Sequence, residues 1–215
     1  MLMLVVVSLA DGSPCATGGV HATYLTAKGD KVAWCDDENL APKKMWGPQS
    51  LGDQPGGTWL IGPAGDGPVG TAEGAENALA LASMEFRRSG RVIRTCAALS
   101  LGRLQGGMLK DDQGRIDPYD VQPDPKRPAF VWPGVKEVWI GIDRDMKTVW
   151  PRCRTPRGKT IPMGLDAEAR ARICAKLASA AWAKAGAKTT PIWASTGSDL
   201  NDDLRRVLAA GKRTA

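Results

Sequence analysis

The sequence has little of what a structural zinc site requires. It contains one histidine, His21, and none of its five cysteines belongs to a C-x-x-C pair. Structural zinc sites are built from closely spaced cysteines and histidines, so we expect no structural zinc within this chain. An odd and scattered set of cysteines is typical of proteins that are kept reduced, and we therefore expect a cytoplasmic protein.

Long hydrophobic runs and nucleotide-binding loops are also missing. No run approaches the roughly 18 apolar residues that a membrane span needs, so we expect no membrane partner. The apolar opening from Met1 to Val7 lacks a basic start and runs directly into Asp11-Gly12, which favours a strand and a turn over a signal peptide. No G-x-x-x-x-G-K-[ST] motif is present, which excludes a P-loop.

The composition is that of an ordinary globular protein with a mild excess of basic residues. The 215 residues are 43% hydrophobic and 24% charged, with a net charge of +6. The stretch from Lys147 to Thr160 holds five basic residues and no acidic one. Such a stretch suits a polyanion such as nucleic acid, although a solvated basic loop would have the same composition.

The first part of the chain is expected to be all-β. Residues Leu2–Ser8, Val20–Leu25, Val32–Trp34 and Thr58–Ile61 have the composition of strands. Turns are expected at Asp11–Gly19 and at Gly29-Asp30, because glycine and aspartate tolerate turn conformations.

From residue 69 the pattern alternates between strands and helices. Strands are expected at 69–72, 91–97, 135–142 and 188–194, the last at a sheet edge because Pro191 lacks an N–H group. Helices are expected at 75–84, within 101–109, at about 166–184 with Asp166 as the cap, and at 202–210. Residues 110–134 and 146–165 are expected to be irregular insertions. This order predicts a parallel sheet with helices on both faces.

Acidic residues gather at three points where an expected strand gives way to a turn. These acidic clusters are Glu73–Glu76, Asp143–Asp145 and Asp199–Asp202. The carboxyl ends of parallel strands form one rim of a sheet, and ligands bind at that rim. Three acidic clusters on one rim would bind divalent cations, since hard cations take oxygen ligands. The pattern points to phosphate chemistry.

The first and last clusters also have simpler explanations. Glu73 could be a favourable charge at the N-terminus of a helix, and Glu76 could face solvent one turn later. Asn201 or Asp202 could cap the last helix.

The middle cluster is the most suggestive of a metal site. Asp143 and Asp145 lie two residues apart after an apolar strand, so in extended backbone their carboxylates point to the same side. Two carboxylates at such a short distance repel each other unless a cation lies between them. The alternative is that Arg144 or the basic stretch neutralises them.

The three clusters, in this order and with these sequences, resemble the Toprim domain of primases, topoisomerases and some nucleases. Thr71–Leu79 resembles the strand–E-G–helix element of that family, Ile140–Asp145 its D-x-D, and Gly197–Leu204 the G-x-D-x-N-D-x-L ending of phage and plasmid primases. Upstream, Val20–Leu25 and Pro42–Pro48 are similar to the segment that precedes Toprim in phage primases. The resemblance reaches to about residue 206.

The resemblance implies an α/β fold, α+β overall, in which a Toprim-like parallel sheet is flanked by helices. A smaller, mainly β subdomain is expected at residues 1–66, the Toprim catalytic domain at 67–206 and a basic tail at 207–215.

The resemblance also implies an activity, which is the Mg²⁺- or Mn²⁺-dependent synthesis of short RNA primers from NTPs on single-stranded DNA. Glu73 corresponds to the general acid/base of the family, and Asp143 and Asp145 to its metal-binding D-x-D. The residues expected to hold metal are Glu73, Asp143, Asp145, Asp199 and Asp202.

Further site candidates are the basic residues near these clusters. Those expected to bind nucleic acid or nucleotide are Lys43, Lys44, Arg144, Lys147, Arg152 and Arg154. Gly74, Glu76 and Asn201 complete the candidate set. Phage primases read the template with a zinc ribbon, so we expect a separate zinc-ribbon protein as a partner, together with a replicative helicase.

Two other functions remain open at the level of sequence. A Toprim nuclease would use the same metal site on a phosphodiester, and a module of a mobile element could bind nucleic acid without turnover. A topoisomerase is disfavoured because it needs a nucleophilic tyrosine on another domain, and the only tyrosines are Tyr24 and Tyr119.

Overall fold

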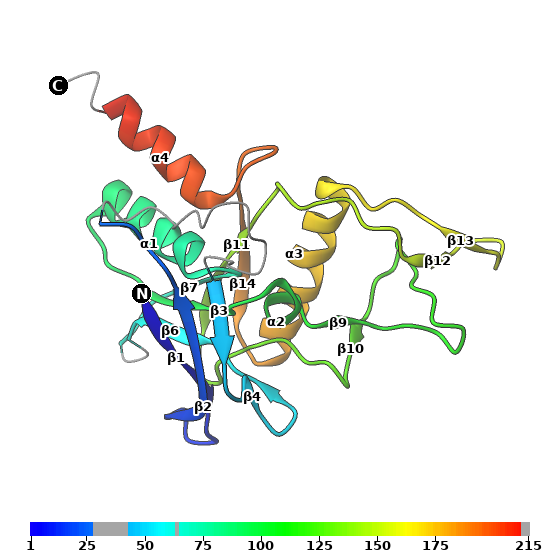
Figure 1. Ribbon diagram of the computed structural model, residues 1–215, viewed down its shortest axis with the longest axis horizontal. Helices are drawn as coiled ribbons and strands as arrows, with labels where there is room; N and C mark the ends of the chain where they lie inside the picture. Colours follow the sequence, from blue (N-terminus) through cyan, green and yellow to red (C-terminus); the bar gives the residue numbers. More distant parts are fainter. Residues whose placement is uncertain (28–42, 63–64, 212–215) are drawn as a thin grey trace.

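A five-stranded sheet forms the centre of the computed structural model, which describes residues 1–27, 43–62 and 65–211 (Figure 1). Its strand order is β14-β11-β7-β8-β6. The first four of these run parallel, and β6 is antiparallel to β8. The strands are β6 (Thr58–Ile61), β7 (Val69–Ala72), β8 (Arg94–Ala97), β11 (Glu137–Ile142) and β14 (Lys188–Trp193).

Helices cover both faces of this sheet, as the alternation of elements predicts. They are α1 (Ala75–Ser89), α2 (Leu101–Gln105), α3 (Ala167–Lys184) and α4 (Leu200–Gly211). Alternate residues of β11 separate the two sides: Val138 and Ile140 pack against α3, whereas Trp139 packs with residues of α1 and α4. The chain is therefore a mixed α/β structure with a mostly parallel sheet (Figure 1).

The position of each strand in the sheet follows from its burial. All four residues of β7 are buried, as expected for a central parallel strand that is covered on both faces. No residue of β14 is fully buried, and this strand lies at the edge, where Pro191 leaves no ladder hydrogen bond unmade. The predicted edge position of this strand is confirmed.

The chain reverses its direction of travel across the sheet between β7 and β11. It passes from β7 through α1 to its neighbour β8, and then crosses back through α2 to β11 on the other side of β7. Successive crossovers in opposite directions place their helices on opposite faces. The connections that leave β7 and β11 therefore diverge to opposite faces, and in open α/β sheets the carboxyl ends of two such strands are where ligands bind.

The N-terminal part is a separate three-stranded antiparallel sheet of β1 (Leu2–Ser8), β2 (Pro14–Thr23) and β3 (Lys43–Trp46), followed by the hairpin of β4 (Ser50–Leu51) and β5 (Gln54–Pro55). The turn expected at Asp11–Gly19 is wrong in its second half, because β2 begins at Pro14. The amide of Leu9 donates to the carbonyl of Ser13, which closes the turn early. The turn expected at Gly29-Asp30 and the strand at Val32–Trp34 lie outside the described residues.

One strand of the expected N-terminal subdomain belongs to the main sheet. β6 has the predicted bounds, and it pairs with β8 rather than with β1 or β2 along its length. β1 forms an isolated bridge with Gly57, the residue before β6, where Val6 and Gly57 exchange two backbone hydrogen bonds of 2.8 and 3.0 Å.

Helix boundaries differ from expectation at α1 and α4. The first helix continues beyond residue 84 to Ser89 and stops at Gly90, whose φ of +74° suits glycine. The last helix begins at Leu200, two residues earlier than expected. The start of α3 is confirmed, because the side chain of Asp166 accepts a hydrogen bond of 2.8 Å from the amide of Ala169.

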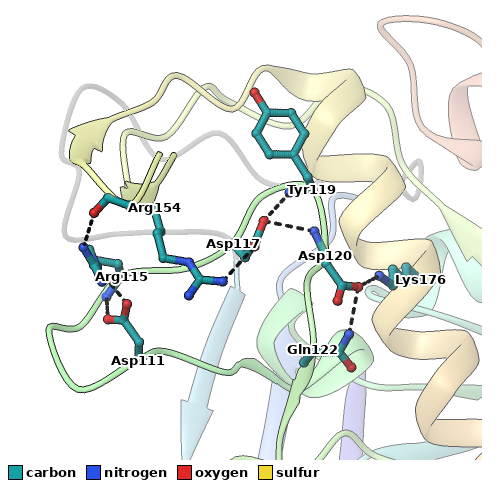
Figure 2. A network of polar contacts seen from close by, with 9 residues as sticks. Asp111, Arg115, Asp117, Tyr119, Asp120, Gln122, Arg154 and Lys176 are labelled. Atoms are coloured by element: carbon teal, nitrogen blue, oxygen red, sulfur yellow. Dashed lines mark hydrogen bonds and ion pairs between the residues drawn. The ribbon is translucent and has the colours of Figure 1, made fainter. Parts of the chain in front are cut away.

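The two insertions are ordered by charged contacts with each other and with α3. In the first, β10 (Pro123–Asp124) pairs with β9 (Gly107–Met108), which lies just before the insertion. The second contains the pair of β12 (Arg152–Arg154) and β13 (Thr160–Pro162). Figure 2 shows the network that joins them: Asp117 pairs with Arg154 at 3.3 Å, and Asp120 pairs with Lys176 of α3 at 2.9 Å.

The described cysteines, which are Cys15, Cys96, Cys153 and Cys174, are all free thiols. Across residues 1–27, 43–62 and 65–211 no helix is both long and apolar enough to cross a membrane. The expected basic tail residues Lys212 and Arg213 lie outside the described residues.

The crossing of β1 and β6 requires a glycine at residue 57. A Cβ there would lie 2.7 Å from the carbonyl oxygen of Ala97 and 2.7 Å from the ring of Phe130. We predict that Gly57→Ala lowers the free energy of unfolding by about 1–3 kcal/mol, the usual cost of overpacking a core. The matched control is Gly62→Ala, since no atom of the described residues lies within 4 Å of a Cβ at that position. Urea denaturation of both variants checks this, and equal midpoints would contradict it.

Candidate active site at the carboxyl ends of the parallel strands

The three acidic clusters follow three adjacent strands of the sheet. Glu73 comes directly after β7, Asp143 directly after β11, and Asp199 after β14. The register pairs Ile140 with Thr71, so its continuation pairs Glu73 with Ile142, the residue before Asp143. The sheet thus brings the three clusters to one rim, as the sequence predicts.

The carboxylate of Asp143 lies at the centre of this group. Burial raises its pKa, and the nearby negative charges of Glu73, Asp199 and Asp145 raise it further, to about 7. Hydrogen bonds from Asn77 act in the opposite direction. Each charge that raises this pKa belongs to one of the predicted clusters, so the clusters interact in the folded chain.

The carboxylate of Glu73 interacts both with the negative charge of Asp145 and with groups that stabilise its ionised form. Burial raises its pKa above the ordinary value, and the charge of Asp145 adds to this. A hydrogen bond from the backbone of Leu101, at the start of α2, lowers it, as do the positive charges of Lys43 and Arg170. A partly buried glutamate with a raised pKa is a candidate for accepting and releasing a proton in catalysis.

Asn77 holds Asp143 in place. Its side-chain amide nitrogen lies 2.8 Å from both carboxylate oxygens of Asp143, and its side-chain oxygen accepts from the backbone amide of Asn201 at 3.2 Å. The residue itself is buried in the first turn of α1. One side chain therefore connects β11 with the starts of α1 and α4.

The start of α4 is brought to the rim by a glycine in β11. A Cβ at Gly141 would lie 2.6 Å from a methyl group of Leu200, so only glycine allows this residue to pack so close to the strand. Leu200 is fully buried there. Asp199, immediately before it, caps α4 by accepting from the amide of Asp202 at 2.8 Å. The cap is thus Asp199, and the expectation of Asn201 or Asp202 in that role is wrong.

Two predicted acidic residues lie at the margin of the group. Asp145 is exposed, yet its charge acts on both Glu73 and Asp143. Asp202 is exposed on the side of α4 away from the buried Leu200, since residues two apart on a helix point about 200° apart. The structure does not bring Asp202 into the group.

The expected basic residues divide between the site and the insertions. Lys43 of β3 forms an ion pair of 3.1 Å with Glu76 at the start of α1, beside Gly74, which precedes that helix. Lys44 follows it in β3 and is half-buried. The N-terminal sheet therefore delivers a cation to the rim next to Glu73.

The remaining basic candidates have other surroundings. Arg144 pairs with Glu168 of α3 at 2.6 Å, and its backbone amide donates to the carbonyl of Ser198. Lys147 is exposed. Arg152 is exposed in β12, and Arg154 of the same strand belongs to the network of the insertions (Figure 2).

Two residues of the site were not expected as site residues. Arg170 of α3 acts on the charge of Glu73, and Asn77 binds Asp143. Asn77 has a weak signal in the sequence, since it is a polar residue in the Ala/Leu-rich segment 75–84, and a polar side chain that such a helix buries needs a partner. Arg170 has none, because its role depends on how α3 packs across the sheet.

The donor set fits a hard divalent cation. Glu73, Asp143, Asp145 and Asp199 offer carboxylate oxygens, the ligand type that Mg²⁺ and Mn²⁺ take. Burial and mutual repulsion raise the pKa of Asp143, and a cation among these carboxylates would relieve that repulsion. In the described part of the chain no three His, Cys, Asp or Glu side chains are arranged as a ready coordination shell. The fit therefore rests on the donor chemistry.

Comparison with known proteins adds no independent assignment. No protein-family model, no curated protein and no solved structure matches this chain. The arguments for function therefore rest on the residues and their arrangement.

The raised pKa of Asp143 makes the stability of the protein depend on pH. The folded pKa of about 7 exceeds the ordinary 3.8, so the native state binds this proton more tightly and stability falls as pH rises from 4 to 7. We predict that Asp143→Asn is more stable than wild type at pH 8 by about 2–4 kcal/mol, after allowance for partial exposure. The difference should vanish near pH 4.

Urea denaturation at both pH values measures this difference, with the exposed Asp112→Asn as the matched control. Millimolar MgCl₂ at pH 8 should stabilise wild type and leave Asp143→Asn nearly unchanged, since the metal needs the carboxylate. A difference that is equal at pH 4 and pH 8 would contradict the assignment of this proton to Asp143.

The hydrogen bonds that Asn77 forms with Asp143 and Asn201 generate a second prediction. Asn77→Ala removes the donor to Asp143 and the acceptor for the amide of Asn201, both in a largely buried place. We expect a loss of about 1–3 kcal/mol in the free energy of unfolding, the cost of leaving such groups unpaired. Gln113→Ala, which truncates an exposed amide, is the matched control and should change stability by less than about 0.5 kcal/mol.

Proposed function

We propose that this chain is the catalytic core of a DNA primase of the phage or plasmid type, with a Toprim-like catalytic fold. The supporting observation is the interaction of Glu73, Asp143, Asp145 and Asp199 at the carboxyl ends of β7, β11 and β14. These residues come from the three clusters that resemble the Toprim motifs. The substrates are NTPs and a single-stranded DNA template, and the expected partners are a separate zinc-ribbon protein and a replicative helicase in the cytoplasm.

The reaction forms one phosphodiester bond and releases pyrophosphate. The 3′-hydroxyl oxygen of one ribonucleotide bonds to the α-phosphorus of an incoming NTP, and the bond from that phosphorus to the pyrophosphate oxygen breaks. The hydroxyl proton must pass to a base. Glu73 suits this role, because burial raises its pKa towards the pH at which it must work.

The other acidic residues supply the metal site. Asp143 and Asp145 would hold Mg²⁺ or Mn²⁺, with Asp199 at the same rim and Glu73 beside them. When bound, a divalent cation stabilises negative charge on the reacting oxygens of a phosphoryl group. Asn77 orients the Asp143 carboxylate through both of its oxygens, which is the kind of support that fixes a metal ligand.

The positive charges around Glu73 favour a phosphate-bearing substrate. Lys43 belongs to the N-terminal sheet and Arg170 to α3, so two separate parts of the fold place positive charge near Glu73. Cations adjacent to a carboxylate cluster can bind the phosphates that the carboxylates alone would repel. The contribution of the N-terminal sheet favours a primase over a nuclease, since this is the segment that resembles the one preceding Toprim in phage primases.

Primer synthesis tests the proposal. Labelled NTPs, a mixed-sequence single-stranded template and a short RNA dinucleotide, which removes the need for a template-reading partner, are supplied with Mg²⁺ or Mn²⁺. We predict extension by wild type and a loss of about 100-fold or more in Glu73→Gln and in the double variant Asp143→Asn, Asp145→Asn. Asp112→Asn, an exposed acidic residue in an insertion, is the matched control and should retain activity.

Other outcomes distinguish the alternatives. No extension, together with metal-dependent nicking of plasmid that Glu73→Gln abolishes, would replace the primase with a nuclease. No turnover, together with binding of single-stranded DNA that neither EDTA nor the double variant changes, would leave a non-catalytic binding module.

A further inference from the structure

An apolar groove lies between α1 and α4, on the face of the sheet opposite α3. Its volume is about 410 Å³. One wall is the ridge of α1 formed by Leu79, Ala82 and Phe86, residues spaced so that they share one side of a helix. Leu204 and Leu208 of α4 form the other wall. Figure 1 shows these two helices side by side.

Large apolar side chains in this groove are exposed to an unusual degree. Phe86 is 53% exposed, and Val92, which also lines the groove, is 64% exposed. At Leu79 the groove meets a second apolar groove of about 550 Å³ between β1 and β6. Continuous apolar surface of this kind on a folded protein indicates a binding site for another molecule.

The groove contains one charged side chain among its described lining residues, and it is a cation. Arg87 has no ion-pair partner in the described parts of the chain, whereas its neighbours Arg88 and Arg91 both bind the buried carboxylate of Glu85, at 2.8 and 3.1 Å. The available charge in the groove is therefore positive, and it is complementary to a carboxylate on the occupant.

The shape of the groove suits a helix. Both walls are helices, and Leu79 and Phe86 are seven residues apart in the sequence, or about 10 Å along the helix axis. A third helix can lie in the groove between two others at the usual packing distance of about 8–10 Å. An amphipathic helix presents apolar residues at the matching spacing of i, i+3, i+4 and i+7.

A second copy of this chain is less complementary to the positive charge of Arg87 than an acidic partner is. A two-fold contact places the same patch on both sides of the interface, so each Arg87 would have to find its partner in the other groove. The lining of the groove holds no carboxylate in its described residues. Self-association through this face would bury an unpaired cation from each copy, which is costly.

We propose that the α1–α4 groove is a docking site for an amphipathic helix of a partner protein, with Phe86 and Val92 contacting its apolar side and Arg87 pairing with an acidic residue. This site lies on the opposite face of the sheet from α3 and does not depend on the proposed primase activity.

The probes for the test are two fluorescein-labelled synthetic helical peptides of about 18 residues, each with a leucine stripe at i, i+3, i+4 and i+7. One carries glutamates and the other lysines on its polar side. By fluorescence anisotropy we expect the glutamate peptide to bind wild type with a Kd between about 1 and 100 μM, and at least tenfold more tightly than the lysine peptide.

Two variants and two matched controls localise the binding. Arg87→Glu and Phe86→Ser should each weaken the glutamate peptide at least tenfold. Arg157→Glu reverses an exposed arginine of an insertion, and Tyr119→Ser removes a side chain that is 71% exposed; both should bind as wild type does. Circular dichroism melting establishes that the variants are folded.

Three results would overturn the proposal. They are no binding of either peptide, equal binding of both, or binding that Arg87→Glu and Phe86→Ser leave unchanged. Sedimentation at increasing protein concentration covers the remaining alternative: a dimer that Phe86→Ser dissociates would assign the groove to a second copy of the chain.

Discussion

The parallel pairing of β7 with β11 is the constraint on which the arrangement of the acidic residues depends. These two strands adjoin in the sheet although they are far apart in the sequence, and the chain reverses its direction across the sheet between them. Their outgoing connections leave to opposite faces, so Glu73 and Asp143 follow the two strands at which the direction of the chain reverses. α1 begins two residues after Glu73, and α3 crosses the other face, where Cys174 and Arg170 lie close enough to the two carboxylates to interact with their charges. A different strand order would separate the two carboxylates without altering either strand.

The same pairing has an energetic cost. Four carboxylates act on one another at the rim, and the one at the centre, Asp143, is partly removed from water. The native structure meets this cost locally. Asn77 donates to Asp143, the backbone of Leu101 donates to Glu73, and Lys43 and Arg170 stand beside Glu73. Proteins retain such unfavourable concentrations of charge where a ligand relieves them, and for closely placed carboxylates that ligand is a cation. The repulsion is thus an argument for function, because stability alone would favour its removal.

Local signals in the sequence predict part of this structure. The bounds of β1, β6 and β7 follow from short apolar runs between turn residues, and the start of α3 follows from the capping residue Asp166. The rim position of the clusters also follows, because each comes after a strand. What the sequence does not predict depends on contacts between distant segments. β6 lies in an apparently separate β region yet joins the main sheet, and Arg170 meets Glu73 only because α3 packs across it. The cap at Asp199 was missed because three neighbouring polar residues compete for that role, and the packing of Leu200 against Gly141 decides among them.

The helix α4 connects the two surfaces that the structure sets apart. Its first turn carries Leu200 against β11, and the residue before it, Asp199, contributes its charge to the acidic group. One and two turns later, Leu204 and Leu208 line the apolar groove against α1. α1 has the same double role, because Asn77 in its first turn holds Asp143 while Leu79 and Phe86 form the groove. A molecule in the groove would therefore contact both helices whose first turns build the rim. Two helices that pack on each other move as rigid bodies, since close-packed interiors resist local deformation. The distance between α1 and α4 therefore affects both the width of the groove and the positions of Asn77 and Asp199 at the acidic site.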